Sequence, residues 1–495
     1  MSEIGQRSAR EVRSIVIVGG GTAGWMAAAG LARVLTRSSC EITVVDSENL
    51  PPTGVGEGTL PDLRAFHGLL EVDEQDFSSA ARATFKLGSR FRDWGMPGGT
   101  FLHPFGPYGI DVTHDLFQAY WLKCRQEGHP SPLAEWSVTG LAATLGRFGA
   151  RPTKDPSPLP QLSYAYHLDE MLYARFLRGY AEKRGARGLA GEVVDAAIDG
   201  RGLIESLRLH DGRSVSGDFF IDCSDGAVLI EGRLKSGYLA WSYWLPCDRA
   251  IAAPCASSGD PALLTQLTAR ECGWQWRMPL RHRVGNGYVY SSAHLSDDQA
   301  AAALLESLEG APLADPRLLR FKAGCRARAW VGNCLALGPA AVSLEPLEST
   351  GIHLTQTGLG RLFSLFPDRD FDPAISAEYN RLTALEYEHA RDFIILHYAA
   401  SPRDDSPFWR DCRAMRLPET LAYKRDLFAK TGRIAMLEEE TFAAASWLAI
   451  YTGLGLWPQR HEPAIDILGS PAMSARFEAM REIIRTAVGA LAHTG

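Results

Sequence analysis

One acidic side chain stands directly before a run of small residues, in the segment from Pro346 to Ile352. Glu348 is followed by serine, threonine and glycine, whose backbone amides could face an anion such as a halide at a helix start. Glu345 lies three residues earlier, and spacing alone does not decide which acid is chemical. The alternative interpretation is an ordinary cap at Ser349 or Thr350, with Glu348 as a first-turn acid favoured by the helix dipole.

A lysine with apolar flanks is the second candidate for chemistry. Lys86 is surrounded in the sequence by Phe85, Leu87, Phe91 and Trp94. An ammonium group that is partly desolvated by such neighbours becomes usable in chemistry. The alternative is a solvated surface charge, which is the usual environment of a lysine.

A pair of tryptophans forms the third pattern. Trp274 and Trp276 lie two residues apart in a segment that ends at Pro279, so in an extended strand the two rings share one face. Packing in the core of the protein is the alternative interpretation of this pair.

These side chains need a scaffold, and the N-terminal part of the sequence predicts one. Ser14–Val18 is an apolar, β-branched run typical of a buried parallel strand, and helical spacing follows from Trp25 to Thr36. A second strand over Glu41–Val45 ends at Asp46, which completes a βαβ unit. The junction between the first strand and the helix consists of Gly19, Gly20, Gly21, Thr22, Ala23 and Gly24.

This junction predicts a dinucleotide site. Glycines let the backbone approach a pyrophosphate, and the helix N-terminus supplies oriented amides and positive potential. Asp46 is placed to accept a hydrogen bond from a ribose hydroxyl. A glycine turn in some other parallel sheet is the alternative for the glycine pattern alone.

Further elements extend along the chain. Strands over Asp218–Asp222 and Asn333–Leu337 belong to the same nucleotide domain, which is therefore predicted to be discontinuous. A strand at Asn286–Tyr290 indicates a second sheet on the substrate side. Long helices are expected at Ile375–Tyr398 and Pro471–Ala492.

Composition sets limits without naming a function. A chain of 495 residues, 46% of them hydrophobic, favours a large two-part architecture. A net charge of -7 argues against nucleic acid as a partner. The nine cysteines have no paired short spacing typical of zinc, so no metal site is expected, and they are predicted to be reduced thiols in a cytoplasmic protein. The apolar run Ile15–Val18 is far too short to span a membrane.

In chain order, the glycine loop, Phe85–Gly88, Gly273–Pro279 and Pro346–Ile352 resemble motifs of the flavin-dependent halogenases of the tryptophan halogenase type. The resemblance runs through nearly the whole chain, and Met278 stands where the family usually has isoleucine. Other matching segments are the flavin strap at Gly54–Gly58, the substrate-site segment Phe101–Gly106, and the C-terminal segments Ser401–Arg403, Ser406–Trp409 and Gly453–Leu456.

The resemblance implies an α/β fold with an FAD-binding βαβ module of the glutathione reductase or hydroxylase kind, a mixed sheet, and an added C-terminal helical substrate module. We expect residues 12–110 and 160–365 in the FAD module, and residues 111–159 and 366–495 in the mainly helical substrate module. Besides the glycine loop and Asp46, the expected cofactor contacts are Ser47, Val55, Gly56, Glu57, Gly58, Val193 and Gly338.

The resemblance also assigns roles. Reduced FAD from a separate NAD(P)H-dependent flavin reductase, oxygen, and chloride or bromide held at Thr350 and Gly351 would give hypohalous acid, which Lys86 receives. His103 and Phe105 would hold the aromatic substrate, and Glu348, the acid directly before Ser-Thr-Gly, would be the base. Trp274, Trp276 and Pro279 form the signature that separates these enzymes from flavin hydroxylases.

One segment departs from the halogenases that act on free tryptophan. Those enzymes carry a longer stretch of tyrosines and acids that binds the charged ends of the amino acid, whereas Met436–Trp447 is short and contains three consecutive alanines. We therefore expect an indole other than free tryptophan as substrate. A flavin-dependent aromatic monooxygenase, a tryptophan halogenase and a non-catalytic flavin-binding protein are the alternatives. A homodimer is left open.

Overall fold

The computed structural model describes residues 10–35, 40–47, 56–109, 114–128, 131–149, 162–257, 259, 262–468 and 471–493. The chain divides into two compact units, each assembled from three segments. Unit 1 consists of Met1–Ala83, Leu168–Ser242 and Phe321–Glu388, and unit 2 of Thr84–His167, Tyr243–Arg320 and His389–Gly495.

The compact units divide the chain differently from the predicted modules. Residues 84–110 and 243–320, expected in the FAD module, belong to unit 2. The reason is non-local strand pairing, which joins these two stretches in one sheet. Because a cofactor module is defined by ligand contacts rather than by compactness, the module boundaries stay a prediction.

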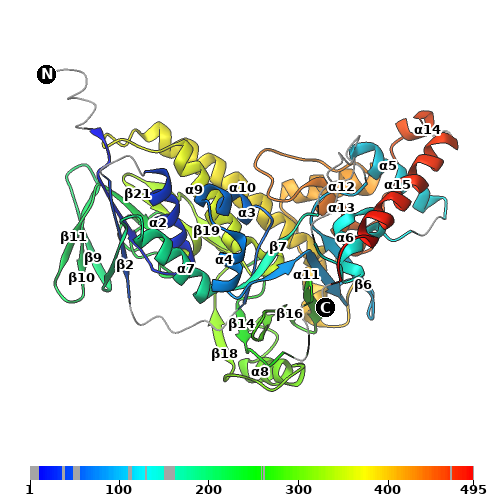
Figure 1. The fold of residues 1–495 in the computed structure, drawn as a ribbon, viewed down its shortest axis with the longest axis horizontal. Helices are drawn as coiled ribbons and strands as arrows, with labels where there is room; N and C mark the ends of the chain where they lie inside the picture. Colours follow the sequence, from blue (N-terminus) through cyan, green and yellow to red (C-terminus); the bar gives the residue numbers. More distant parts are fainter. Residues whose placement is uncertain are drawn as a thin grey trace. The chain divides into compact units, whose positions relative to one another are not determined.

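A six-stranded sheet forms the centre of unit 1 (Figure 1). In spatial order its strands are β20 (Trp330–Val331), β21 (Cys334–Ala336), β12 (Phe219–Asp222), β1 (Ser14–Val18), β2 (Glu41–Asp46) and β8 (Arg187–Ala190). Strand β1 is parallel to both of its neighbours, β2 and β12. Its apolar residues are buried, which accounts for the continuous β-branched run in the sequence. The predicted first strand, helix and second strand are confirmed.

Helix α2 (Thr22–Val34) follows β1 and packs beside α7 and α9. The other helices of unit 1 are α3 (Leu63–Leu70), α4 (Glu74–Ala80), α7 (Glu170–Glu182) and α9 (Thr350–Ser364), with 3-10 turns η2 (Gly338–Ala340) and η3 (Leu347–Ser349). Its remaining strands are β3 (Gly56–Gly58), β9 (Val193–Ile198), β10 (Ile204–Leu209), β11 (Ser214–Ser216), β13 (Tyr238–Ala240), β19 (Gly324–Arg326) and β22 (Val342–Ser343).

Unit 2 is built on a seven-stranded mixed sheet. In spatial order its strands are β18 (Arg317–Arg320), β14 (Arg249–Ala252), β17 (Val284–Tyr290), β16 (Gly273–Pro279), β15 (Leu264–Arg270), β5 (Gly88–Arg92) and β6 (Thr100–Pro104). The strand expected at Asn286–Tyr290 is confirmed as part of β17. A separate short strand, β4 (Thr84–Lys86), pairs antiparallel with the start of β7 (Ala165–Asp169).

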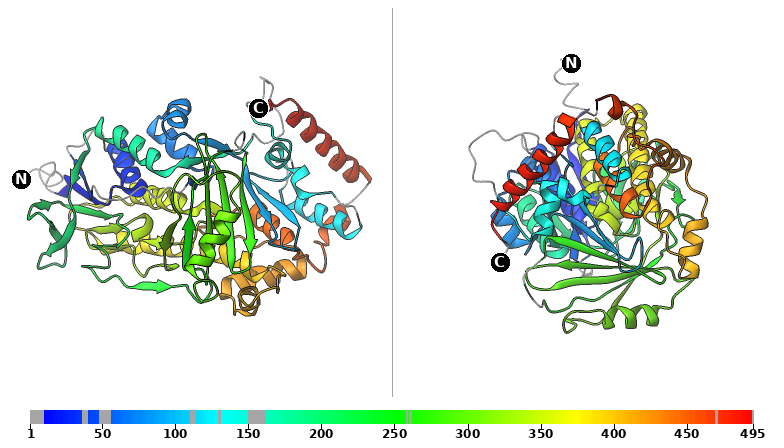
Figure 2. Two further views of the ribbon diagram at one scale, coloured as in Figure 1. Left: turned by 90° about the horizontal axis from the view of Figure 1, so that it is seen from below. Right: turned by 90° about the vertical axis from the view of Figure 1, so that its right-hand side faces the viewer.

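Helices surround this sheet. Figure 2 shows α8 (Asp297–Glu306) lying against the strands β14 and β17. The other helices of unit 2 are α5 (His114–Gln126), the 3-10 turn η1 (Leu133–Trp136), α6 (Val138–Thr144), α11 (Pro407–Ala414), α12 (Glu419–Thr431), α13 (Ala444–Gly453), α14 (Ala464–Leu468) and α15 (Pro471–Gly489). Helix α10 (Pro373–Ala399) begins in unit 1 and ends in unit 2. The two long helices predicted from the sequence are α10 and α15.

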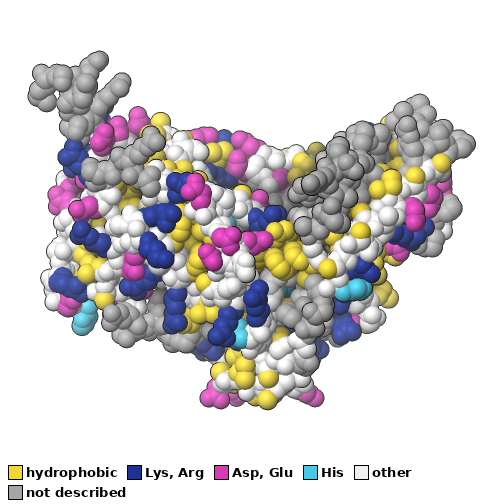
Figure 3. All heavy atoms as spheres, viewed as in Figure 1, with side chains coloured by type: hydrophobic (Ala, Val, Ile, Leu, Met, Phe, Trp, Pro, Cys, Tyr) yellow, Lys and Arg dark blue, Asp and Glu magenta, His cyan; other side chains and the backbone are white. Residues whose placement is uncertain are grey.

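The surface charges and the cysteines agree with what the composition suggested. On the face drawn in Figure 3, basic and acidic side chains are interspersed. The nine cysteines all belong to the described residues and form no disulfide; seven are buried while Cys40 and Cys124 are half-buried. Among the described helices, none is long and apolar enough to cross a bilayer. The described residues contain no group of three or more histidine, cysteine or acidic side chains placed to hold a metal ion.

Candidate active site

The predicted nucleotide loop lies at the carboxyl edge of the parallel sheet in unit 1. The strands β2 and β12 lie on opposite sides of β1, which makes the end of β1 the point where the chain order of the sheet changes direction. Ligands of open α/β sheets bind at such points. Gly19 donates its N–H to the Val45 carbonyl at 2.9 Å, which fixes the loop to the end of β2.

Two glycines of this loop have opposite surroundings. A Cβ atom built on Gly20 would lie 2.0 Å from the Cγ of Asp46, so the Asp46 side chain covers this residue directly. A Cβ atom on Gly21 would meet nothing within 4 Å. Gly21 is also the N-cap of α2 and has no side chain to cap the helix. Its open surroundings and the first amides of α2 therefore fit the pyrophosphate of a dinucleotide.

A cavity of about 270 Å³ adjoins this loop within unit 1. Six residues predicted to hold the cofactor or the halide line it: Thr22, Ala23, Glu57, Gly338, Thr350 and Gly351. Gly338 has φ of 58°, and a Cβ there would come within 2.6 Å of the Ala23 Cβ, so only glycine permits this close approach. The cavity thus brings together segments that are more than 300 residues apart in the sequence, and its lining fits a flavin ring.

The sequence reasoning missed other lining residues, including Glu170 and Asp225. Glu170 begins α7, and its carbonyl accepts from the Thr22 hydroxyl at 3.3 Å. Asp225 follows the end of β12, the parallel neighbour of β1. Its position after a predicted strand was the signal that could have identified it.

Glu348 lies in a strained backbone turn. Glu348 and Ser349 have φ of 65° and 61°, both in the left-handed region that residues other than glycine rarely adopt. Each such residue costs on the order of 1 to 3 kcal/mol, so the surrounding structure must hold the turn. Glu348 is 3% exposed and Glu345 is 1% exposed, so burial does not distinguish the two acids. Of these two acids, only Glu348 has a left-handed backbone conformation.

Helix α9 starts directly after this turn and points its first residues into the cavity. Thr350 and Gly351 line the cavity, and the side chain of the N-cap residue Ser349 makes no capping hydrogen bond to the helix. A Cβ atom on Gly351 would lie 3.6 Å from Oε1 of Glu57. The Glu57 carboxylate therefore already lies near the positive end of α9, a place that favours negative charge.

Lys86 in unit 2 is fully buried, at 0% exposure. Its Nζ lies 5.3 Å from the centre of the Phe105 ring, within the range of a cation–π interaction. The Phe105 N–H donates to the Leu87 carbonyl at 2.9 Å, which fixes the ring beside the lysine. Phe85 and Leu87, expected to surround Lys86, belong instead to a separate apolar cluster, because neighbours along a strand face opposite sides. The expected burial is present, with Phe105 as the contact.

His167 is a buried neighbour of Lys86 that the sequence reasoning missed. Its Nε2 lies 2.8 Å from the Thr265 hydroxyl and its Nδ1 lies 3.4 Å from that of Thr84. Burial first, and then the positive charges of Lys86 and Arg277, hold the pKa of His167 well below its usual range. His167 is therefore a neutral imidazole at pH 7. No spacing in the sequence indicated it.

The tryptophan pair has a structural place. Trp274 and Trp276 are 0% and 3% exposed, with ring centres 6.0 Å apart, and Trp276 packs on Gly287. The carbonyl of Pro279, at the end of the same strand, accepts from the Thr84 hydroxyl at 2.6 Å. The signature strand β16 therefore anchors β4, the strand that carries Lys86.

His103 is 4% exposed and lies beside a group of aromatic side chains. Its ring centre lies 6.0 Å from that of Phe393 and 6.4 Å from that of Phe442. Phe393 stacks on Phe442 at 3.9 Å and meets the edge of Trp447 at 5.0 Å. Phe442 and Trp447 come from the segment Met436–Trp447, so this segment supplies apolar rings beside His103.

Glu440, the last acidic residue of this segment, already has a partner. Glu440 forms an ion pair with Lys424, and the two side chains are 5% and 1% exposed. The Lys424 ammonium also lies 4.2 Å from the centre of the Trp447 ring. Glu440 is therefore engaged within the protein.

Several predicted cofactor residues do not line the cavity. Ser47, Gly56 and Gly58 lie in or next to strands of unit 1, and Val193 begins β9, where it pairs with Leu209. Gly54 and Val55 lie outside the described residues. The flavin contacts of this group stay a prediction.

Comparison with known proteins agrees with the geometry. A family model for tryptophan halogenase matches residues 14–470. The structure of a flavin-dependent halogenase from Brevundimonas sp. is 47% identical, covers 98% of both chains and superposes with a TM-score of 0.92. One from Xanthomonas campestris is 43% identical, covers 98% of this chain and 97% of the other, and has a TM-score of 0.93. Tryptophan 7-halogenase RebH from Lentzea aerocolonigenes is 33% identical over 92% of each protein.

The chain therefore belongs to the tryptophan halogenase family. It is a flavin-dependent halogenase, an oxidoreductase that uses reduced FAD and oxygen to halogenate an aromatic substrate. The resemblance inferred from the motifs and the predicted fold class are confirmed.

The two loop glycines give a matched test of the FAD site. Gly21→Val should weaken FAD binding by on the order of tenfold or more, because the new side chain enters the open space beside the helix start, while the melting temperature changes little. Gly20→Val should lower the melting temperature, because its Cβ meets Asp46. Flavin titration and thermal unfolding of both variants measure these effects. Unchanged flavin affinity in Gly21→Val would contradict the placement of the pyrophosphate.

Proposed function

We propose that this enzyme halogenates an indole that lacks the amino-acid group of tryptophan, with Lys86 delivering the halogen and Glu348 accepting the proton. The observation that carries the proposal is the complete burial of Lys86 with its ammonium against the Phe105 ring. A lysine kept from water in this way can meet a reactive halogen species without losing it to solvent.

FAD would be held in unit 1 by the glycine loop, Asp46 and the residues of the 270 Å³ cavity. When bound in its reduced form, supplied by a separate NAD(P)H-dependent flavin reductase, FAD would provide hypohalous acid from oxygen and halide. The amides at the start of α9, at Thr350 and Gly351, would hold chloride or bromide. Because the Glu57 carboxylate lies beside Gly351, its side chain would turn away when a halide binds.

The substrate ring would be held beside His103 and Phe105 by packing. Lys86 would place the electrophilic halogen at a ring carbon, so that a carbon–halogen bond forms and the ring becomes cationic. Glu348 would stabilise that cation and remove the proton from the same carbon, which restores the aromatic ring. The left-handed turn at Glu348 supports this choice over Glu345, since strained backbone is held in place at functional positions.

The segment Met436–Trp447 supports a substrate without charged ends. It contributes Phe442 and Trp447 beside His103, while Glu440 is neutralised by Lys424. Ala444 and Ala445 form the first turn of α13 and have no polar side chains to offer. A zwitterion would therefore lose hydration there with few groups to replace it.

Removal of the lysine amine tests its role. Lys86→Met should lower the rate of product halogenation by about a hundredfold or more, because the side chain keeps its length but has no nitrogen to carry the halogen. FAD affinity and flavin-dependent oxygen consumption should stay near the parent values, since Lys86 acts after the flavin step. Lys86→Arg keeps the charge and should also be inactive. Halogenation at the parental rate by Lys86→Met would overturn the assignment.

The two buried acids form a matched pair. Glu348→Gln should lower turnover by about a hundredfold or more, because the amide keeps the size of the side chain but cannot accept the ring proton. Glu345→Gln should retain most of the activity. Both variants are compared by initial rates with saturating reduced flavin. The reverse order of the two rates would make Glu345 the base.

Substrate choice is tested by direct competition. In a mixture of equal amounts of indole and tryptophan, halogenated indole should exceed halogenated tryptophan by about tenfold or more, because an unpaired buried polar group costs on the order of 1 to 3 kcal/mol. Mass spectrometry of the mixture gives the ratio. Dominant halotryptophan would show that other residues bind the amino-acid group.

A further inference from the structure

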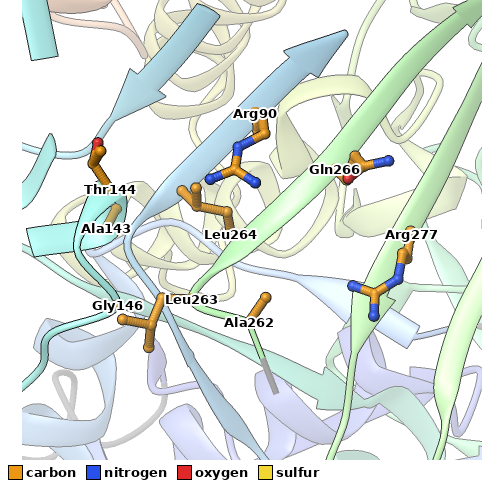
Figure 4. A pocket seen from close by; sticks show the side chains of 9 residues that line it. All are labelled: Arg90, Ala143, Thr144, Gly146, Ala262, Leu263, Leu264, Gln266 and Arg277. Atoms are coloured by element: carbon orange, nitrogen blue, oxygen red, sulfur yellow. The ribbon is translucent and has the colours of Figure 1, made fainter. Parts of the chain in front are cut away.

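A second cavity, of about 190 Å³, lies within unit 2 on the large sheet. Figure 4 shows Arg90 and Arg277 directing their guanidinium groups toward it from two sides, with Leu264 beside Arg90. Nothing in the halogenation chemistry proposed above uses this cavity.

Strand register places the polar residues of this cavity in one row. Gln266 of β15 is paired with Arg90 of β5 on one side and with Arg277 of β16 on the other. Cross-strand partners project from the same face of a sheet. The row therefore consists of two guanidinium groups and one amide, each from one of three adjacent strands.

This row faces away from the proposed substrate site. Side chains alternate between the two faces along a strand. His103 is paired with Ser89, the residue before Arg90, and Trp276 precedes Arg277. His103 and Trp276 thus project from the opposite face, and a ligand in this cavity is separated from the aromatic substrate by the sheet.

The charges at this cavity do not cancel. Arg277 donates from Nε and one terminal nitrogen to the two carboxylate oxygens of Glu309, at 2.9 and 2.7 Å. Arg90 is half-buried, and its guanidinium group has no hydrogen bond or ion pair to any described residue. Two arginines and one glutamate leave a single positive charge at the cavity. A guanidinium group in this setting favours a planar, bidentate anion, and a singly charged carboxylate matches both the shape and the charge.

Apart from Thr144, the rest of the lining is apolar, with Ala143, Leu263 and Leu264 buried beside the arginines. We propose that this cavity binds a small organic monocarboxylate, with the carboxylate on Arg90 and an apolar body against these three residues. The site is distinct from the proposed halide and substrate sites and does not depend on how they work.

A ligand bound in this cavity would influence β4, the strand of the proposed catalytic lysine, through one hydrogen bond. The Leu263 carbonyl, in the cavity wall, accepts from the N–H of Leu87 at 2.7 Å. Leu87 is the residue next to Lys86. A ligand that packs against Leu263 would therefore restrict the movement of the residue that follows the lysine strand.

Isothermal titration calorimetry with benzoate and the full-length protein tests the proposal. Benzoate should bind saturably to the parent, and benzamide, which has the same body without the charge, should bind at least about tenfold more weakly. Arg90→Gln should lower benzoate affinity by a similar factor, and Arg90→Lys should give an intermediate loss because it keeps the charge without the planar fork. Arg92→Gln is the matched control, since Arg92 lies two residues along the same strand on the same face but does not line the cavity. It should bind benzoate like the parent.

Circular dichroism and thermal unfolding establish that each variant is folded before titration. Equal benzoate affinity in folded Arg90→Gln and parent would overturn the proposal, as would the absence of saturable binding to the parent. Binding that survives Arg90→Gln and is displaced by indole would place benzoate in the aromatic substrate site instead, which also overturns it. Acetate, which keeps the carboxylate but lacks the ring of benzoate, separates the two parts of the proposal. Acetate affinity equal to that of benzoate would show that the carboxylate alone is recognised and would contradict the role of the apolar wall.

Discussion

The burial of one ammonium group is the constraint around which unit 2 is arranged. Moving an isolated charge out of water is costly, so the protein must surround Lys86 with groups that compensate for lost hydration. The Phe105 ring supplies a cation–π contact, and the neighbouring His167 stays neutral and adds no second charge. The hydrogen bond from Thr84 to Pro279 ties the lysine strand to the central sheet. The strand that carries the tryptophan signature, β16, therefore supports the lysine strand through Pro279.

Unit 2 must bury a cation, whereas unit 1 must leave space for a large anionic ligand. Parallel strands end at one edge, and two helices, α2 and α9, begin there with residues that carry no side-chain cap at the N-cap position. Both helix starts are therefore suited to anions, one to a pyrophosphate and the other to a halide. The glycines at 21 and 338 keep the intervening space open, each for a different reason. Gly21 faces empty space, whereas Gly338 allows close approach to Ala23.

The sequence predicted local features well because short-range physics determines them. β1 begins and ends at the predicted residues, and six of the expected cofactor or halide residues line one cavity. Long-range pairing was not predictable: β5 pairs with β15, about 175 residues later, so residues near Lys86 join unit 2. The left-handed turn at Glu348 and Ser349 was also unforeseen, because neither residue type favours it. His167 carried no signal, because it lies 83 residues after Thr84, its partner on the adjacent strand β4, and such a separation has no characteristic spacing.

This enzyme makes a carbon–halogen bond on an aromatic ring rather than hydroxylating it. The most direct measurement is the product mass when the protein, a flavin reductase, NADH and indole react in bromide buffer under air. We expect a product in which one hydrogen is replaced by bromine. It should appear as a doublet of nearly equal peaks from the two bromine isotopes and should be absent when bromide is omitted. A product that gains only one oxygen atom, formed equally well without halide, would contradict this expectation and indicate an aromatic monooxygenase.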